Sequence, residues 1–221
     1  MTTYNYTTAE LVKNELRATQ DFSITTVPTL VSVTNWIQEE SANINNNAGQ
    51  IFGESTYSET FDYNGADVLL VTHAPIMSVT SILYSTTALG TTTYDLSDTK
   101  TEDTDYTVYK DSGEIEFLPS WSPSSGKKRI QINYTAGHAT TPLNIQSLAT
   151  KKVTKRIIDT LLSKDINEKQ SGKSISVGSI SIVKPADFGV SQYKVLKDDI
   201  TRLEEEVIGG TSLYRLPLNR Y

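Results

Sequence analysis

The chain has 221 residues, a length typical of one large domain or two small ones. Only 37% of these residues are hydrophobic, against about 45–50% in ordinary soluble domains, which predicts short strands, loops or surfaces that are buried only on assembly. Because the chain has no cysteine, disulfide frameworks, thiolate nucleophiles and cysteine-based zinc sites are excluded. The formal charge of −6 argues against a general nucleic-acid binder, which carries a basic face.

The sequence predicts neither a membrane span nor a secretory signal. It contains no run of about 18 apolar residues, the length that crosses a bilayer. Its first ten residues, MTTYNYTTAE, lack the basic and apolar regions of a signal peptide. We therefore expect a soluble protein that is made in a cytoplasm, has no membrane partner and acts by binding.

Two helices are predicted before residue 54. Thr7 and Glu10 have the spacing of a capping box, so the first helix begins there and ends around residues 19–21. A second helix follows Pro28, because apolar residues recur every seven positions, and Gly53 stands where a left-handed C-cap belongs. The apolar stripe consists of Leu30, Ile37, Ile44 and Ile51, widened by Val33, Trp36, Ala48 and Phe52.

Between residues 56 and 134 the apolar period changes to two, which predicts β-strands. The expected strands are 56–63, 68–71, 76–84, 106–109, 114–118 and 129–134. Asn64-Gly65 is a strong hairpin signal and predicts that the first two strands pair. Residues 110–113 have the composition of a turn between 106–109 and 114–118. Five or six such strands indicate a small twisted sheet or open barrel inserted between helices.

Helical periodicity returns after Pro142, with an apolar stripe from Ile145 to Leu162. Residues 174–183 alternate apolar and polar, which predicts an amphipathic hairpin or extended arm. Apolar residues then recur at 3-4 spacing up to Val207, as in a helix seated in a seam, and Gly209-Gly210 ends it. The predicted fold class is therefore α+β: a bundle of about four helices with an inserted small antiparallel β-sheet or open barrel and an extended C-terminal arm. The predicted parts are core helices in 1–55, a β-rich subdomain in 56–140, further core helices with a hairpin in 141–208, and a docking tail in 209–221.

The motifs of catalytic and ligand-binding sites are incomplete in this sequence. Ser125-Gly126-Lys127-Lys128 is similar to the end of a phosphate-binding loop, but Trp121 stands where the first glycine belongs, so a solvated hairpin turn is predicted. His73 and His138 lack the local context of a catalytic base and are predicted as surface or turn histidines. A mobile acidic loop without calcium-binding geometry is predicted at Asp98, Glu102, Asp103 and Asp105. We expect no catalytic residue, no cofactor and no metal.

Charge is sorted along the chain. Residues 54–119 hold twelve acids against Lys100 and Lys110, whereas the predicted helix 142–164 holds five bases against Asp159. In an oligomer, an acidic face of one copy could meet a basic face of the next and set the register; two solvated faces explain the pattern equally well. Residues 211–221 are apolar, aromatic and basic, unlike the polar ends of most chains, and are interpreted as a docking tail.

Five short motifs follow one another between residues 7 and 183. They are Ile37-x6-Ile44 with Gly49-Gln50-Ile51-Phe52; Tyr57 to Phe61 with Asn64-Gly65 and Leu69-Leu70-Val71; Pro75-Ile76-Met77-Ser78-Val79; Ile130-x-Ile132-x-Tyr134-Thr135-Ala136-Gly137 before Pro142; and Ser176-Val177-Gly178-Ser179-Ile180-Ser181-Ile182. In this order they resemble the head–tail connector (adaptor, or head-completion) proteins of tailed bacteriophages. Gln50 and Ser179 replace the arginine and aspartate usual in that family, so an ion pair that those residues make in relatives is absent here.

The resemblance implies a structural virion protein of the phage neck, assembled in the host cytoplasm. Such proteins form a ring, usually of twelve copies, beneath the portal protein, and a tail, stopper or nozzle protein binds the far side. Double-stranded DNA passes through the ring without specific binding, which an acid-rich protein suits. A closed ring also needs a heterologous head-to-tail interface.

Two sets of interface residues follow from this resemblance. The set expected to dock on the portal or a neighbour comprises Tyr193, Leu196, Ile200, Leu203, Leu213, Tyr214, Arg215, Leu216, Leu218 and Tyr221, with Tyr214, Arg215 and Leu216 as anchors. The set expected in the ring interface comprises Ile175, Val177, Ile180, Ile182, Lys151, Lys152, Lys155 and Arg156.

Two other functions remain open from the sequence. A tail-completion or baseplate protein could use the same sheet to bind a tail tube. A polysaccharide-acting hydrolase is less favoured, and it predicts a concave pocket with coupled carboxylates.

Overall fold

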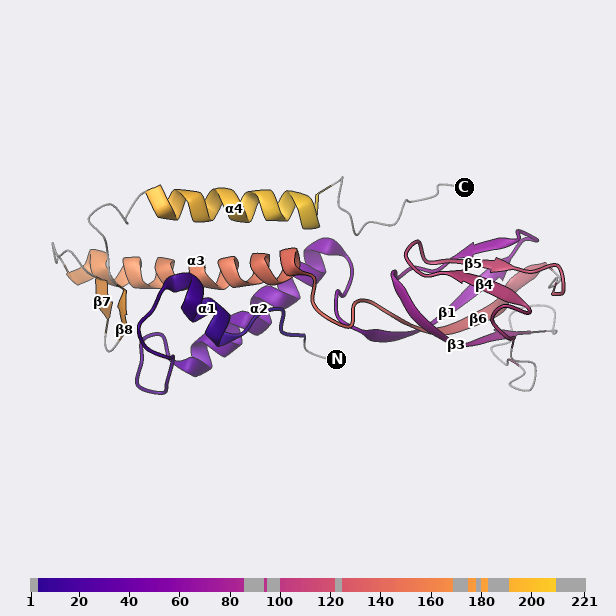
Figure 1. The fold of residues 1–221 in the computed structure, drawn as a ribbon, viewed down its shortest axis with the longest axis horizontal. Helices are drawn as coiled ribbons and strands as arrows, with labels where there is room; N and C mark the ends of the chain where they lie inside the picture. The colour runs from indigo at the N-terminus through magenta and orange to yellow at the C-terminus, as the bar shows by residue number, and fades with distance from the viewer. Residues whose placement is uncertain are drawn as a thin grey trace. The chain divides into compact units, whose positions relative to one another are not determined.

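The chain forms two compact units, which are described separately (Figure 1). The helical unit lies within residues 1–49 and 141–215, and the sheet unit within residues 50–140. The computed structural model describes the backbone of residues 4–85, 94, 100–121, 125–168, 175–177, 180–182 and 191–209 and, except in 162–168, 175–177, 180–182 and 191–192, their side chains.

The helical unit is organised around one long helix. Helices α1 (Ala9–Leu16), α2 (Leu30–Ala48) and α4 (Ser191–Val207) all pack on α3 (Leu143–Glu168), and the hairpin of β7 (Ile175–Val177) and β8 (Ile180–Ile182) also contacts α3. Apolar side chains from α1, α2, α3 and the α1–α2 connection form one core: Val12, Leu16, Ala18, Phe22, Val33, Ile37, Val153, Ile157 and Leu161. This unit confirms the predicted helices and the antiparallel hairpin.

Two predicted helix ends are displaced by a few residues. The N-cap of α1 is Thr8, whose hydroxyl accepts a hydrogen bond from the Leu11 amide at 3.3 Å, while the predicted cap Thr7 is buried and its hydroxyl lies 2.6 Å from that of Thr150. Helix α2 ends at Ala48, and Gly49 adopts the left-handed C-cap conformation with φ 71°. The prediction of Gly53 was wrong because Ile51 and Phe52 continue the apolar spacing beyond the end of the helix.

The sheet unit contains two three-stranded antiparallel sheets. The first has the order β1 (Ser55–Tyr63), β6 (Gly126–Ala136), β3 (Ile76–Tyr84), and the second has the order β2 (Val68–Leu70), β5 (Glu114–Phe117), β4 (Tyr106–Tyr109). Side chains from both sheets form one core, which makes the unit a small sandwich: Tyr63, Val71, Ile76, Ile82, Tyr84, Tyr106, Ile115, Phe117, Trp121, Ile130, Ile132, Tyr134 and Ala136. Together with the helices, these sheets confirm the α+β fold class.

The strand pairing corrects one prediction and confirms another. Asn64-Gly65 does form a turn, in which the Asn64 side chain accepts the Ala66 amide at 3.0 Å, but β1 pairs with β6 and β2 pairs with β5. The turn therefore passes the chain from one sheet to the other and does not close a hairpin. Residues 110–113 do join paired strands, β4 and β5. Gly126 begins β6, so the predicted turn at 125–128 is instead the start of a strand.

Candidate functional site

Three of the five motifs meet where the chain enters and leaves the sheet unit. The His138 amide donates to the Phe52 carbonyl at 3.0 Å, and the Gly137 amide donates to the Pro75 carbonyl at 2.9 Å. Gly53 and His138 also form an isolated β-bridge. We call these five residues, Phe52, Gly53, Pro75, Gly137 and His138, the stem. The sequence predicted its motifs, but their convergence became visible only in the structure.

The stem has room for glycine alone at position 137. Gly137 has φ 113°, a left-handed conformation that favours glycine. A Cβ added there would lie 2.2 Å from the Gly53 carbonyl oxygen and 3.2 Å from the Glu54 amide nitrogen. Phe52, which precedes Gly53, and Ala136, which precedes Gly137, are buried at 1% and 0% exposure. The motif residues of the stem therefore maintain the geometry of the fold.

A polar network lies on the sheet unit, centred on Glu59 of β1. Its Oε1 accepts the Tyr134 hydroxyl at 2.5 Å and lies 2.9 Å from His73 Nδ1, while Oε2 accepts the Thr72 amide at 3.0 Å. The Tyr57 ring stacks on the His73 imidazole, with centroids 3.8 Å apart. His73 was predicted as a surface or turn histidine. It does follow β2, but its ring contacts Glu59 and Tyr57, and its Nδ1 also lies 3.3 Å from the Tyr134 hydroxyl. Tyr57 and Glu59 on one face of the strand were the only local signal of this network.

The hydrogen bonds of this network keep Glu59 ionised at neutral pH. Burial alone raises the pKa of Glu59, but hydrogen bonds from His73, Tyr134 and Thr72 outweigh burial and lower that pKa to about 2. Burial, followed by the hydrogen bond to Glu59, raises the pKa of Tyr134 well above its usual range. A carboxylate that is already saturated by three donors and a tyrosine that stays protonated are suited to holding strands together, since neither is free to accept or release a proton at neutral pH.

We predict that Glu59→Gln destabilises the sheet unit by about 1–3 kcal/mol at pH 7. Because the pKa of Glu59 is lowered by folding, its ionisation stabilises the native state above pH ~4.5, and this contribution is lost as the pH falls toward 2. Urea unfolding between pH 7 and pH 2 should therefore show a shallower loss of stability in the variant than in the wild type. The exposed Glu102 provides the matched control; Glu102→Gln should change stability little, and equal pH profiles for wild type and Glu59→Gln would contradict the assignment.

The basic residues of α3 are paired within the chain. We expected contacts between ring neighbours at Lys151, Lys152, Lys155 and Arg156. Their shortest side-chain partners are Glu15 for Lys151 at 2.8 Å, Glu204 for Lys152 at 2.5 Å, Asp159 for Lys155 at 2.5 Å and Glu39 for Arg156 at 2.5 Å. Lys151 also lies 3.1 Å from Asp199. The acids come from α1, α2, α3 itself and α4, so these four charges hold the helical unit together.

The apolar stripe of α4 is also covered within the chain. Leu196, Ile200 and Leu203, which were expected to dock on a partner, are only 8%, 8% and 4% exposed, and α4 packs on α3. The Tyr193 hydroxyl donates to Asp159 of α3 at 2.6 Å. The seam that the 3-4 spacing predicts is therefore provided by the subunit's own α3. Polar contacts between the two helices continue at Asp199 and Glu204 of α4, which pair with Lys151 and Lys152 of α3.

The remaining predicted interface residues have no described side chains. Ile175, Val177, Ile180 and Ile182 form the paired backbone of the β7–β8 hairpin. The tail residues lie outside the described part of the chain: Leu213, Tyr214, Arg215, Leu216, Leu218 and Tyr221. For all of these residues, the interface assignment remains a prediction.

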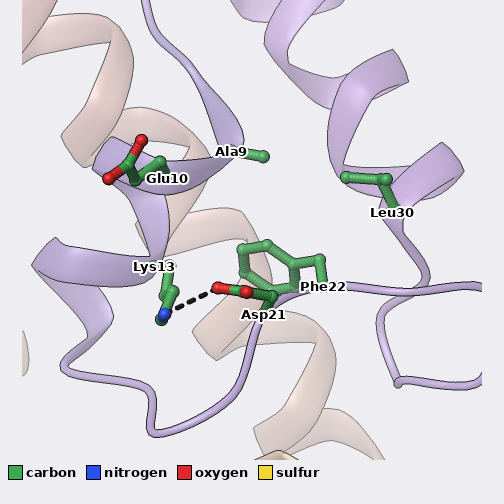
Figure 2. A pocket seen from close by; sticks show the side chains of 6 residues that line it. All are labelled: Ala9, Glu10, Lys13, Asp21, Phe22 and Leu30. Atoms are coloured by element: carbon green, nitrogen blue, oxygen red, sulfur yellow. Dashed lines mark hydrogen bonds and ion pairs between the residues drawn. The ribbon is translucent and has the colours of Figure 1, made fainter.

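A hollow of about 510 Å³ lies in the helical unit between α1 and the start of α2 (Figure 2). Its charged side chains are Glu10, Lys13 and Asp21, and Lys13 Nζ is 2.6 Å from the Asp21 carboxylate. The Asp21 side chain is 86% exposed. A hydrolase needs two carboxylates held together in a sheltered pocket; here one carboxylate is solvated and neutralised by a lysine, so the hollow does not match that requirement.

The described residues contain neither a metal-binding cluster nor a membrane-spanning helix. Among them, no group of three or more histidine, aspartate or glutamate side chains could hold a metal ion. In the same part of the chain, no helix combines the length and the apolar character needed to cross a bilayer.

The sequence matches no protein-family model, and no curated protein matches it. Two solved structures are similar to the fold. One, described as the neck of an empty gene transfer agent (GTA) particle computed with C6 symmetry, is 14% identical with a TM-score of 0.47, over 84% of this chain and 87% of the other. The second, from the virion of a native GTA particle, is 16% identical with a TM-score of 0.49, over 88% of this chain and 87% of the other.

Proposed function

We propose that this chain is a structural subunit of a virion neck, an adaptor that forms a ring under the portal and joins the head to the tail. The observation that supports this most directly is the stem. Motifs that resemble those of phage connector proteins, separated by up to 80-odd residues in sequence, are held together there by backbone hydrogen bonds between Phe52 and His138 and between Pro75 and Gly137. They are thus part of one folded feature, and are not chance matches scattered over the surface.

The distribution of charge supports a DNA conduit. Residues 50–140, which contain the sheet unit, hold twelve acids and five bases, a formal charge of −7, whereas the rest of the chain has fourteen acids and fifteen bases. An acid-rich lining repels the phosphate backbone and lets DNA pass without being held. We propose a structural role without catalysis, in which the sheet unit supplies this repulsive surface.

The helical unit indicates how assembly would proceed. Its bases are paired internally and its α4 stripe is buried on α3, so we expect the subunit to be folded before it meets a partner. The proposed contact with the portal then involves the tail, and the proposed contact between ring neighbours involves the β7–β8 hairpin. Within the tail, Tyr214, Arg215 and Leu216 remain the proposed anchors, because aromatic and arginine side chains dominate binding energy in many interfaces.

We predict that replacing Tyr214, Arg215 and Leu216 together by alanine abolishes co-sedimentation with the purified portal protein. The loss of three anchor side chains should weaken binding by more than about 100-fold, since single anchors often contribute 2 kcal/mol or more. Lys194→Ala with Val195→Ala, at exposed positions of α4, is the control and should sediment like the wild type. Unchanged binding of the triple variant would refute the tail as the portal anchor.

The same assay separates the main alternative. A tail-completion or baseplate protein should bind purified tail-tube protein and leave the portal in the supernatant. Native mass measurement of the portal-bound complex gives the number of copies, for which we propose twelve.

A further inference from the structure

Asn64 and Gly65 lie in the exposed connection between β1 and β2. Residues 64–68 are all exposed, and a Cβ built on Gly65 would meet no atom within 4 Å. The side-chain oxygen Oδ1 of Asn64 accepts the Ala66 amide at 3.0 Å. This hydrogen bond closes a ring that contains the side-chain carbonyl carbon Cγ of Asn64 and the backbone nitrogen of Gly65, so it limits how far these two atoms can separate.

These two atoms are the electrophile and the nucleophile of a possible ring closure. After hydroxide removes its proton, the Gly65 nitrogen attacks Asn64 Cγ. A new bond forms between them, the bond from Cγ to the side-chain nitrogen breaks, and that nitrogen leaves as ammonia with a proton from water. Water then adds to one of the two carbonyls of the five-membered succinimide, and the ring opens to aspartate or isoaspartate. The net reaction is hydrolysis of the side-chain amide, and water is its only co-reactant.

Three features of this connection favour the ring closure. The Ala66 N–H donates to Oδ1, the atom on which negative charge develops as Cγ is attacked, and a donor at a developing oxyanion lowers the barrier. In the described part of the chain, the Gly65 N–H donates no hydrogen bond, so no internal bond is lost when it gives up its proton. Glycine also leaves its nitrogen uncrowded, because it has no Cβ.

The other asparagines whose surroundings are described lack this arrangement. Each of them except Asn5 lies in a helix or strand, where the regular backbone dihedral angles prevent the next amide from rotating onto Cγ. The amide after Asn5 belongs to the buried Tyr6, and it donates to Ser41 Oγ at 3.1 Å. In the whole sequence, Asn64 alone is followed by glycine.

We propose that Asn64 is a site of spontaneous deamidation in the folded protein, through a succinimide formed with Gly65. The substrate is the side-chain amide of Asn64 itself, and the products are aspartate and isoaspartate at the same position. The reaction adds one negative charge to a unit whose formal charge is already −7. Isoaspartate also adds a methylene group to the backbone that connects the two sheets. This chemistry is independent of the proposed role in a virion neck.

Peptide mapping by mass spectrometry measures the reaction in the full-length protein, incubated in mildly alkaline buffer at physiological temperature. Electron-transfer fragmentation distinguishes isoaspartate from aspartate. We expect conversion at Asn64 to be at least about tenfold faster than at any other asparagine, with isoaspartate among the products. Gly65→Ala is the matched control, because its methyl group crowds the attacking nitrogen and should slow the conversion at least about tenfold. Circular dichroism checks that both proteins are folded during the incubation.

Mapping of the wild type in guanidinium chloride separates the effect of the folded connection from that of the unfolded chain, and it needs no variant. We expect the rate at Asn64 in the folded protein to equal or exceed the rate in denaturant, because the fold already holds Cγ and the Gly65 nitrogen together. A slower rate in the folded protein would overturn the assignment, since the fold would then protect Asn64. Equal rates in the wild type and Gly65→Ala would overturn it as well.

Discussion

Gly137→Ala should unfold the sheet unit at physiological temperature or leave it barely stable. The added Cβ would lie 2.2 Å from the Gly53 carbonyl oxygen, a backbone atom that cannot rotate away. It would also hold an alanine at φ 113°. Backbone strain of about 1–3 kcal/mol and overpacking of about 1–3 kcal/mol together predict a loss of about 2–6 kcal/mol in the free energy of unfolding.

A second glycine provides the matched control. Gly65 also has a positive φ, 91°, but a Cβ there would meet no atom within 4 Å, so Gly65→Ala should cost only the conformational strain of about 1–2 kcal/mol. The chain has two tryptophans, and Trp121 is buried in the sheet unit. Its fluorescence in a Trp36→Phe background therefore reports unfolding of that unit in urea. Equal midpoints for the two glycine variants would contradict the close approach at the stem.

Leu203→Ala should lower the stability of the isolated subunit by about 2–4 kcal/mol. Leu203 is 4% exposed on α4, which packs on α3, and truncating a buried leucine removes apolar contact and leaves a cavity. If α4 were instead held ready for a partner, the same substitution would leave the monomer unchanged and weaken only assembly. The experiment thus tests whether the apolar stripe of α4 stabilises the subunit itself or serves to bind a partner.

Val195 on the same helix is the control, because it is 59% exposed. Val195→Ala should change stability by no more than about 0.5 kcal/mol. Urea unfolding followed by helical circular dichroism measures both variants. A Leu203→Ala midpoint that matches the wild type would restore the docking interpretation of the stripe.

Local patterns were sufficient for most secondary-structure elements. The 3.6-residue periodicity after Pro142 predicts α3, and strict alternation in 174–183 predicts the β7–β8 hairpin. Helix ends were less accurate: Thr7 and Thr8 are both plausible caps, and only the hydrogen bond to the Leu11 amide selects Thr8. The position of a cap depends on a single hydrogen bond, whereas a helix is predicted from the spacing of many apolar residues, so one misplaced residue matters less.

Pairing between distant segments could not be predicted in the same way. Asn64-Gly65 encodes a turn, but whether the following strand returns to β1 or joins another strand depends on a distant segment, here β5. The Glu59 network joins β1, β6 and the connection after β2, so none of its members has a local motif. Similarly, the charge of α3 suggested an interface because the sequence shows five bases close together. It does not show that the acids pairing with Lys151, Lys152 and Arg156 come from other helices.

By itself, then, the sequence determined the kinds of element, the sorting of acids into the sheet unit and the motifs that resemble a phage connector. Only the tertiary structure showed that the α4 stripe is buried within the subunit and that Lys151, Lys152 and Arg156 of α3 pair with acids of other helices. The physical reason is that periodicity and composition show which side of a segment is buried and which side faces water. Which other segment, or which partner, covers the buried side is set by long-range packing.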